Sequence, residues 1–151
     1  MLARMMSGGQ TGVDRAALDV ARARGVPSGG WCPNGRKAED GVIEARYPLT
    51  ETPSADYEQR TAWNVRDADG TLVLSRGTPS GGTAQTIAFA KTYRKPYLVV
   101  DLSDCPDSSM IRAWIRTQGV KTLNVAGPRE SKAPGIYAQA AALLQTVLSE
   151  E

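Results

Sequence analysis

The sequence contains no histidine and only two cysteines, Cys32 and Cys105. Without histidine, neither a Ser-His nor a Cys-His nucleophile pair can be built. The two cysteines form no CxxC pair, so the motifs of a disulfide framework and of a Cys/His zinc site are both excluded. Acid–base chemistry would fall to Asp, Glu, Lys, Tyr or Cys. The sequence therefore favours binding over catalysis, and we predict no catalytic residue and no metal site.

Long apolar runs and a large net charge are also missing. The first residues lack an apolar stretch long enough for a signal peptide, and no later stretch approaches the length of a membrane span. The net charge of +2 is too small to indicate a nucleic-acid-binding protein. We therefore expect a cytoplasmic protein whose partners are neither nucleic acid nor membrane.

Apolar stretches with strand and helix patterns alternate along the chain. The length of 151 residues suits one domain, so we predict a single ligand-binding domain over residues 1–151. Strand patterns are expected at residues 2–6, 26–31, 71–74, 97–102 and 122–126, with helical patterns between and after them. This alternation predicts a three-layer Rossmann-like α/β fold, in which helices cover both faces of a mostly parallel sheet of about five strands. A strand order of 2-1-3-4-5 fits the short crossovers.

Three predicted strand-to-helix turns are rich in glycine and polar residues: residues 7–12 (SGGQTG), 75–83 (SRGTPSGGT) and 127–135 (GPRESKAPG). Turns of this kind lie beyond the carboxyl ends of the strands, where open α/β sheets bind ligands. Glycines allow the backbone N–H groups to approach an anion, and a helix N-terminus attracts negative charge. We therefore predict that these turns bind a small phosphate-bearing molecule. The second turn lacks the lysine of a P-loop.

Several side chains near these turns allow two interpretations. Thr11 and Asp14 have the spacing of a helix capping box, although Asp14 is also a candidate acceptor for a ligand amine or hydroxyl. Cys32 is either a soft metal ligand or a small buried hydrophobe. The charged and aromatic residues of the long segment 32–55 and its neighbours either fold over the ligand or serve solvation and core packing.

The candidate ligand-binding residues come from all three turns and from the segment that follows the second strand. They are Ser7, Gly8, Gly9, Gln10, Thr11, Gly12, Asp14, Arg15, Arg36, Lys37, Ser80, Gly81, Gly82, Thr83, Arg129 and Ser131.

Blocks of sequence across nearly the whole chain resemble the molybdenum cofactor carrier family, within the wider Rossmann-like group that includes lysine-decarboxylase-like nucleotide binders. The blocks are SGGQTGVDRAALDVA (7–21), GGWCPNGRKAEDG (29–41), YPLTET (47–52), RTAWNVRDADGTLVL (60–74), SGGT (80–83), KPYLVVDL (95–102) and LNVAGPRESKAPGIY (123–137). The resemblance implies a carrier of molybdenum cofactor (molybdopterin), a pterin with a phosphate and a dithiolene-held metal. It also implies a homo-oligomer, a dimer or a tetramer, and molybdoenzymes as recipients of the cofactor.

The sequence departs from one neighbouring group of enzymes. Nucleotide phosphoribohydrolases of the lysine-decarboxylase-like type carry PGGxGTxxE, in which the glutamate takes part in catalysis. Here Gln85, Thr86 and Ile87 follow the matching turn and no acid is present. The turn can still bind phosphate after this change, but it lacks the glutamate that N-glycosidic hydrolysis uses in those enzymes. The alternative function is a nucleotide-binding enzyme or sensor with a nucleotide or nucleotide-sugar ligand.

Overall fold

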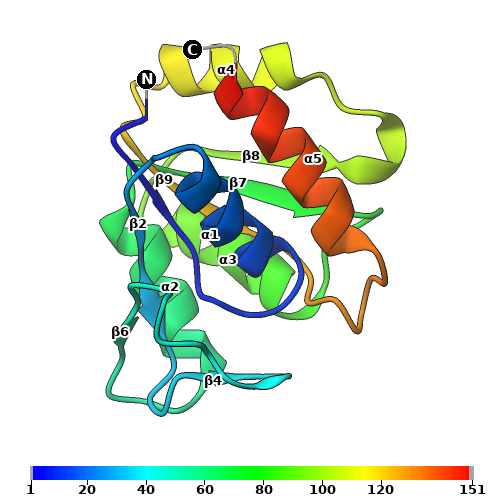
Figure 1. The fold of residues 1–151 in the computed structure, drawn as a ribbon. Helices are drawn as coiled ribbons and strands as arrows, with labels where there is room; N and C mark the ends of the chain where they lie inside the picture. Colours follow the sequence, from blue (N-terminus) through cyan, green and yellow to red (C-terminus); the bar gives the residue numbers. More distant parts are fainter. Residues whose placement is uncertain (1, 150–151) are drawn as a thin grey trace.

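In the computed structural model, which describes residues 2–149, the chain forms a five-stranded parallel sheet with helices on both faces (Figure 1). The predicted α/β fold is therefore confirmed. The strands of this sheet are β1 (Arg4–Met6), β2 (Ser28–Gly29), β7 (Gly70–Ser75), β8 (Tyr97–Asp101) and β9 (Thr122–Ala126). The helices are α1 (Val13–Ala23), α2 (Tyr57–Asp67), α3 (Gly81–Thr92), α4 (Ser108–Thr117) and α5 (Ile136–Ser149), with a short 3-10 helix η1 (Leu102–Asp104).

The strand order, which the sequence does not fix, places the last strand at the centre of the sheet. The order is β2-β1-β9-β7-β8, so the last strand of the chain lies in the middle of the sheet, hydrogen-bonded to β1 and β7. The order 2-1-3-4-5, which is compatible with short crossovers, is not adopted, because β9 does not add to an edge. Strand β9 contains Leu123 and Val125, both fully buried, and the centre of the sheet keeps them covered on both faces.

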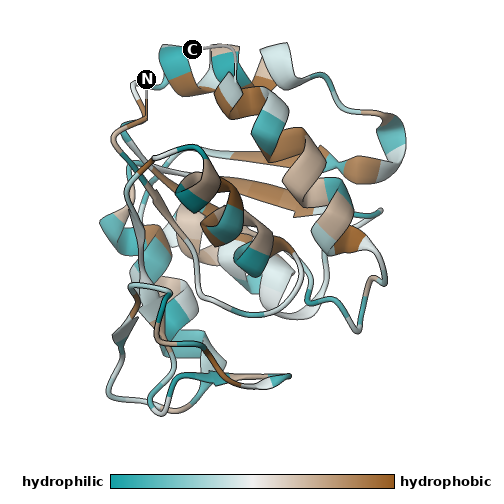
Figure 2. Ribbon diagram, in the orientation of Figure 1, coloured by the Kyte–Doolittle hydropathy of each residue, from teal (hydrophilic) through white to brown (hydrophobic). Residues whose placement is uncertain are grey.

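The helices divide between the faces as the crossovers require. Helix α5 packs on α1 and α4, whereas α2 packs on α3 (Figure 1). Right-handed crossovers that run in opposite directions along a parallel sheet place their helices on opposite faces. The buried face of α1 consists of small and β-branched residues at helical spacing, such as Val13, Ala17 and Val20. Strand β7 is buried along its whole length, and much of it has the brown colour of hydrophobic residues in Figure 2.

The second predicted strand is interrupted at Gly30. Only Ser28–Gly29 pair with β1, and Trp31–Cys32 form β3, which pairs with β6 (Thr50–Glu51) outside the main sheet. Gly30 has a φ of 128°, and a Cβ there would lie 2.3 Å from the carbonyl oxygen of Ser7. The chain turns out of the sheet at this glycine, which begins the long segment over the site.

The long segment after β3 is ordered by a small apolar cluster of its own. Ile43 and Tyr47 pack with Leu18 of α1 and with Cys32. The hairpin formed by β4 (Lys37–Ala38) and β5 (Gly41–Val42) extends from this cluster, and we call residues 37–42 the hairpin. The hydrophobic residues of the segment thus hold it against α1, which places the hairpin beside the first strand-to-helix turn.

Candidate functional site

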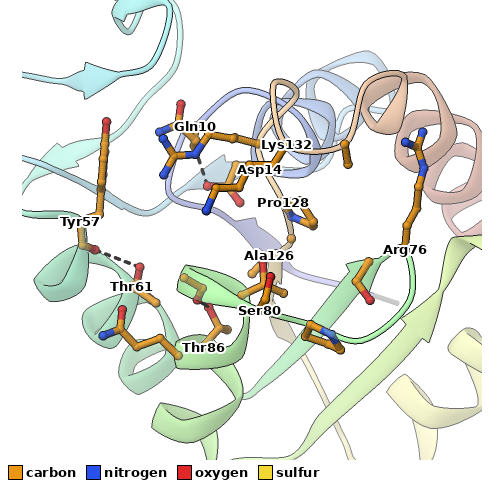
Figure 3. A pocket seen from close by; sticks show the side chains of 18 of the residues that line it. Gln10, Asp14, Tyr57, Thr61, Arg76, Ser80, Thr86, Ala126, Pro128 and Lys132 are labelled. Atoms are coloured by element: carbon orange, nitrogen blue, oxygen red, sulfur yellow. Dashed lines mark hydrogen bonds between the residues drawn. The ribbon is translucent and has the colours of Figure 1, made fainter.

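The structure contains a cavity of about 290 Å³ at the carboxyl ends of β1, β7 and β9. The turns that follow these three strands line it, and α2 closes one side (Figure 3). The chain leaves β1 toward β2 and leaves β7 toward β8, in opposite directions from the central strand β9. Such a switch point opens a crevice between diverging turns, which is where α/β sheets bind ligands. The cavity therefore lies where the fold predicts a ligand.

The turn after β7 carries two unused backbone donors, and one of them belongs to a residue that lines this cavity. Among the described residues, the N–H groups of Gly81 and Gly82 have no hydrogen-bond partner, while those of Thr83 and Ala84 donate to the carbonyl of Ser80. Gly82 lines the cavity, and a Cβ at this position would meet no atom within 4 Å. Free amides at the start of a twelve-residue helix are suited to an anion. Ser80 and Thr83 line the same part of the cavity.

Three backbone amides of the turn after β1 bind the protein's own side chains. The N–H of Gly9 donates to Ser7 Oγ at 3.4 Å, that of Gln10 to Asp14 Oδ2 at 3.3 Å, and that of Thr11 to Gln10 Oε1 at 3.0 Å. The polar side chains of the turn fold back on it and satisfy these donors. Bare amides at Gly9, Gln10 and Thr11 are therefore not available to a ligand.

Close packing accounts for the glycines of this first turn. A Cβ at Gly8 would lie 1.7 Å from Arg60 Nη1, and one at Gly12 would lie 2.4 Å from the carbonyl oxygen of Pro128. Gly9 has a φ of 78° and lies against Leu49 of the long segment. These glycines let the first turn contact α2, the third turn and the long segment.

Asp14 forms a buried ion pair with a residue that sequence reasoning did not select. Arg60 of α2 places Nη1 2.9 Å from Asp14 Oδ2, and both side chains are largely buried. Burial raises the pKa of the Asp14 carboxyl, and the charge of Arg60 lowers it by less. The predicted capping box is absent, because α1 begins after Gly12 with no side-chain cap and Thr11 Oγ1 accepts from the N–H of Glu130. The pair lies at the wall of the cavity.

Three cations surround the ring of Tyr57, the first residue of α2. Lys37 Nζ lies 4.7 Å from the ring centroid, and the guanidinium carbons of Arg60 and Arg129 lie at 5.3 and 5.6 Å. Lys37 comes from the hairpin and Arg129 from the turn after β9, so the fold brings two predicted residues together here. The concentration of positive charge at one edge of the cavity favours an anionic ligand.

The turn after β9 contributes side chains to the cavity, but the helix that follows it already has a capped N-terminus. The carboxylate of Glu130 accepts from the N–H groups of Gly135 and Tyr137, at 2.6 and 2.9 Å, and so caps the start of α5. Arg129 and Lys132 line the cavity, as the charges of this turn predicted. The basic residues of the third turn therefore face the start of α3.

Other predicted residues hold the long segment in place. The guanidinium of Arg15 donates to the carbonyl of Gly9 and forms an ion pair with Asp40 at 3.0 Å. Arg36, at a φ of 54°, donates to four backbone carbonyls of its own segment. Ser131 donates to Glu39 of the hairpin. None of these three is among the residues that line the cavity.

The structure also decides between the two interpretations of Cys32. Its side chain is fully buried in the apolar cluster of the long segment, and burial raises the pKa of the thiol. It does not line the cavity. Within residues 2–149, no group of three or more His, Cys, Asp or Glu side chains is placed to hold a metal ion. Cys32 is therefore a core residue.

Sequence reasoning missed several residues that the fold brings to the cavity: Arg60, Thr61, Arg76 and Thr86. Arg76 lies within the second glycine-rich turn, and its position next to β7 could have identified it. Arg60 and Thr61 come from α2, whose place beside the turns depends on the strand order. No local sequence signal separates them from the exposed residues of an ordinary helix.

A family profile and a solved structure both match nearly the whole chain. The sequence profile of the circularly permutated YpsA SLOG family matches residues 5–148. A crystal structure from Syntrophus aciditrophicus SB, of a protein described as a "putative molybdenum carrier protein", superposes with a TM-score of 0.94 at 45% sequence identity, and covers 97% of this chain and 95% of that chain. The structure of (E)-4-hydroxy-3-methyl-but-2-enyl diphosphate reductase is far more distant, with 13% identity and a TM-score of 0.41. No curated protein matches significantly. Within residues 2–149, no helix has the length and apolar character needed to cross a membrane.

Proposed function

Because the chain belongs to the circularly permutated YpsA SLOG family, we propose that it binds a phosphate-bearing small molecule in the cavity and carries it unchanged. The observation that carries this proposal is the pair of unpartnered amides, Gly81 and Gly82, at the start of α3. Lys132 and Arg129 extend into the same cavity from the turn after β9. A phosphate at this position would receive backbone hydrogen bonds and neutralise side-chain charge at once.

The proposed cargo is molybdenum cofactor. The support is the 45% identical protein described as a putative molybdenum carrier, together with the phosphate that the cofactor bears on its pterin. The phosphate would lie at the start of α3, and the pterin ring would extend toward Tyr57. Since Cys32 lies in the core, the chain would hold the cofactor by its organic part, leaving the metal to the dithiolene. A nucleotide is the alternative cargo, since it also joins a flat ring to a phosphate.

The cavity is small for a whole cofactor to be enclosed. Ligand pockets generally span about 300–1,000 Å³, and this one, at about 290 Å³, lies just below that range. Part of the cargo would therefore extend beyond the cavity toward the hairpin or solvent. We further propose that the protein acts in the cytoplasm as a homo-oligomer and transfers its cargo to molybdoenzymes.

The test is a binding titration with molybdopterin freshly released from a molybdoenzyme, with and without molybdate, monitored by pterin fluorescence. We expect about one cofactor per chain and an affinity at least tenfold weaker in Gly82→Val, because the valine side chain would occupy the open space beside the free amides. Arg129→Ala should also weaken binding, and Arg116→Ala, on the exposed side of α4, is its matched control. Absence of binding to either form of the cofactor would exclude the carrier function. Tighter binding of nucleoside monophosphates would favour the alternative.

A further inference from the structure

Gln10 lines the cavity, and its buried side chain has an unused donor. Gln10 is only 6% exposed, and its amide oxygen accepts from the N–H groups of Thr11 and Glu39, at 3.0 and 2.8 Å. A side-chain amide nitrogen is a donor and cannot accept from an N–H group. The two backbone donors therefore fix which end of the amide faces them. The Nε2 group is left at the other end, and among the described residues it has no partner.

Arg60, which binds the same carboxylate as the Gln10 backbone, supplies a second unused donor. Its Nη1 binds Asp14 Oδ2, the same carboxylate oxygen that accepts from the backbone N–H of Gln10, so the two residues converge on one atom. Arg60 Nε is buried and also has no partner in the described part of the chain. Both residues line the cavity. Native proteins pair nearly all of their buried donors, and a pair of orphans beside a cavity points to an acceptor supplied from outside.

We propose that Gln10 and Arg60 form a donor subsite for an acceptor oxygen of the ligand, separate from the anion subsite at the start of α3. The inference rests on the proposed function, since the ligand must also place a phosphate at α3. A ring carbonyl oxygen and a second phosphoryl oxygen would both satisfy the subsite. A ring that carries an amino group at that place would leave the donors of Gln10 and Arg60 without an acceptor.

The subsite depends on the hairpin as well as on the turn. The N–H of Glu39, which lies in the hairpin, is one of the two donors that orient the Gln10 amide. When the hairpin lies against the first turn, Nε2 is directed away from it. The hairpin therefore helps to select a ligand without contacting the selected oxygen.

The test is titration calorimetry of the purified full chain with four probes: inorganic phosphate, inorganic diphosphate, guanosine 5′-monophosphate and adenosine 5′-monophosphate. Guanine has a ring carbonyl where adenine has an amino group. We expect a preference of about tenfold, either for the guanosine over the adenosine monophosphate or for diphosphate over phosphate. The first preference identifies a carbonyl oxygen as the acceptor, and the second identifies a phosphoryl oxygen.

Gln10→Glu keeps the oxygen that accepts from Thr11 and Glu39 but replaces the donor with an acceptor. We expect this variant to lose the preference. Gln85→Glu adds the same charge to the cavity lining. It should weaken the binding of all four probes while it preserves the preference. The subsite is excluded, and the anion site stands, if the wild-type protein binds phosphate but shows neither of the two preferences. The same conclusion follows if a preference is unchanged in Gln10→Glu. If none of the four probes binds the wild-type protein, both the anion site and this subsite are excluded.

Discussion

Gly9 and Gly82 belong to equivalent turns but are glycines for different reasons. Gly9 has a φ of 78°, and a Cβ there would lie 2.5 Å from Leu49 Cδ1, whereas Gly82 has open space in front of it. We expect Gly9→Ala to lower the free energy of unfolding by about 2 kcal/mol or more, through left-handed strain and overpacking. Gly82→Ala should leave it unchanged or raise it by up to about 1 kcal/mol. Urea unfolding measures both. Equal stabilities of the two variants would contradict this difference.

Arg60 offers a second test at the residue scale, because it neutralises a buried carboxylate. Arg60→Met would leave Asp14 buried without its counter-charge, and we expect a loss of about 3–5 kcal/mol at pH 7. Burial already raises the pKa of Asp14, and removal of Arg60 would raise it further. A raised pKa in the folded state favours the protonated form, so the loss should shrink as the pH falls.

Urea unfolding at pH 7 and at pH 4.5 would measure this change. Arg66→Met is the matched control, because Arg66 pairs with Asp67 at 2.7 Å on the surface, where both side chains are more than a third exposed. That variant should cost less than about 1 kcal/mol at both pH values. A loss for Arg60→Met that does not depend on pH would show that Asp14 is not the group left unpaired.

At the scale of elements, Glu39 fastens the hairpin to two turns. Its carboxylate accepts from Thr11 Oγ1 of the first turn and from the N–H of Ser131, at 3.2 Å, in the third. Burial raises the pKa of Glu39, but hydrogen bonds from Ser131 and Thr11 outweigh it and lower the pKa below its ordinary value of 4.5. A depressed pKa in the folded state means that the contact is intact above pH 4.5 and is lost as the pH falls through the folded value.

We therefore expect acidification to release the hairpin before the sheet unfolds. Hydrogen exchange of the amides of residues 37–42 should become faster, relative to the amides of β7, when the pH falls below the folded pKa of Glu39. Glu39→Ala should produce the same loss of protection at pH 7. Glu44→Ala, which removes an exposed partner of Arg46, is the control and should leave the hairpin protected. Unchanged protection in Glu39→Ala would mean that other contacts hold the hairpin.

The arrangement of the strands and helices also shows how much the sequence could predict. The elements follow from apolar periodicity and glycine positions, so the alternation of strands and helices and the three turns could be read directly. The strand order could not, because the middle position of β9 arises from long-range packing. The contribution of Arg60 depends on that order. The hydrogen bonds of the Gly9, Gln10 and Thr11 amides could not be predicted either, because a sequence does not show that Ser7, Gln10 and Asp14 fold back to bind them.

For the whole molecule, the cavity concentrates a charge that the chain as a whole does not have. The net charge is +2, yet Arg60, Arg76, Arg129 and Lys132 line the cavity, and Asp14 is the acidic residue among the lining residues. Like charges that converge on a small volume repel one another and destabilise the folded state unless an anion joins them. The molecule therefore combines a conventional apolar core with a positively charged cavity that an anion would neutralise.

This arrangement predicts a linkage between anion binding and global stability. The cavity is built from turns that follow β1, β7 and β9 and from α2, so a bound anion connects segments distant in sequence. A ligand at 100 times its Kd adds about 2.7 kcal/mol, which for a chain of this size corresponds to a rise in Tm of about 5–10 °C. Inorganic phosphate at 100 times its Kd should raise Tm by this amount relative to chloride at the same ionic strength. Lys132→Ala combined with Arg129→Ala should remove most of the rise while it leaves the Tm in chloride nearly unchanged or higher, because repulsion within the cavity is relieved. An equal response of the wild-type and doubly substituted proteins to phosphate would show that the anion binds elsewhere.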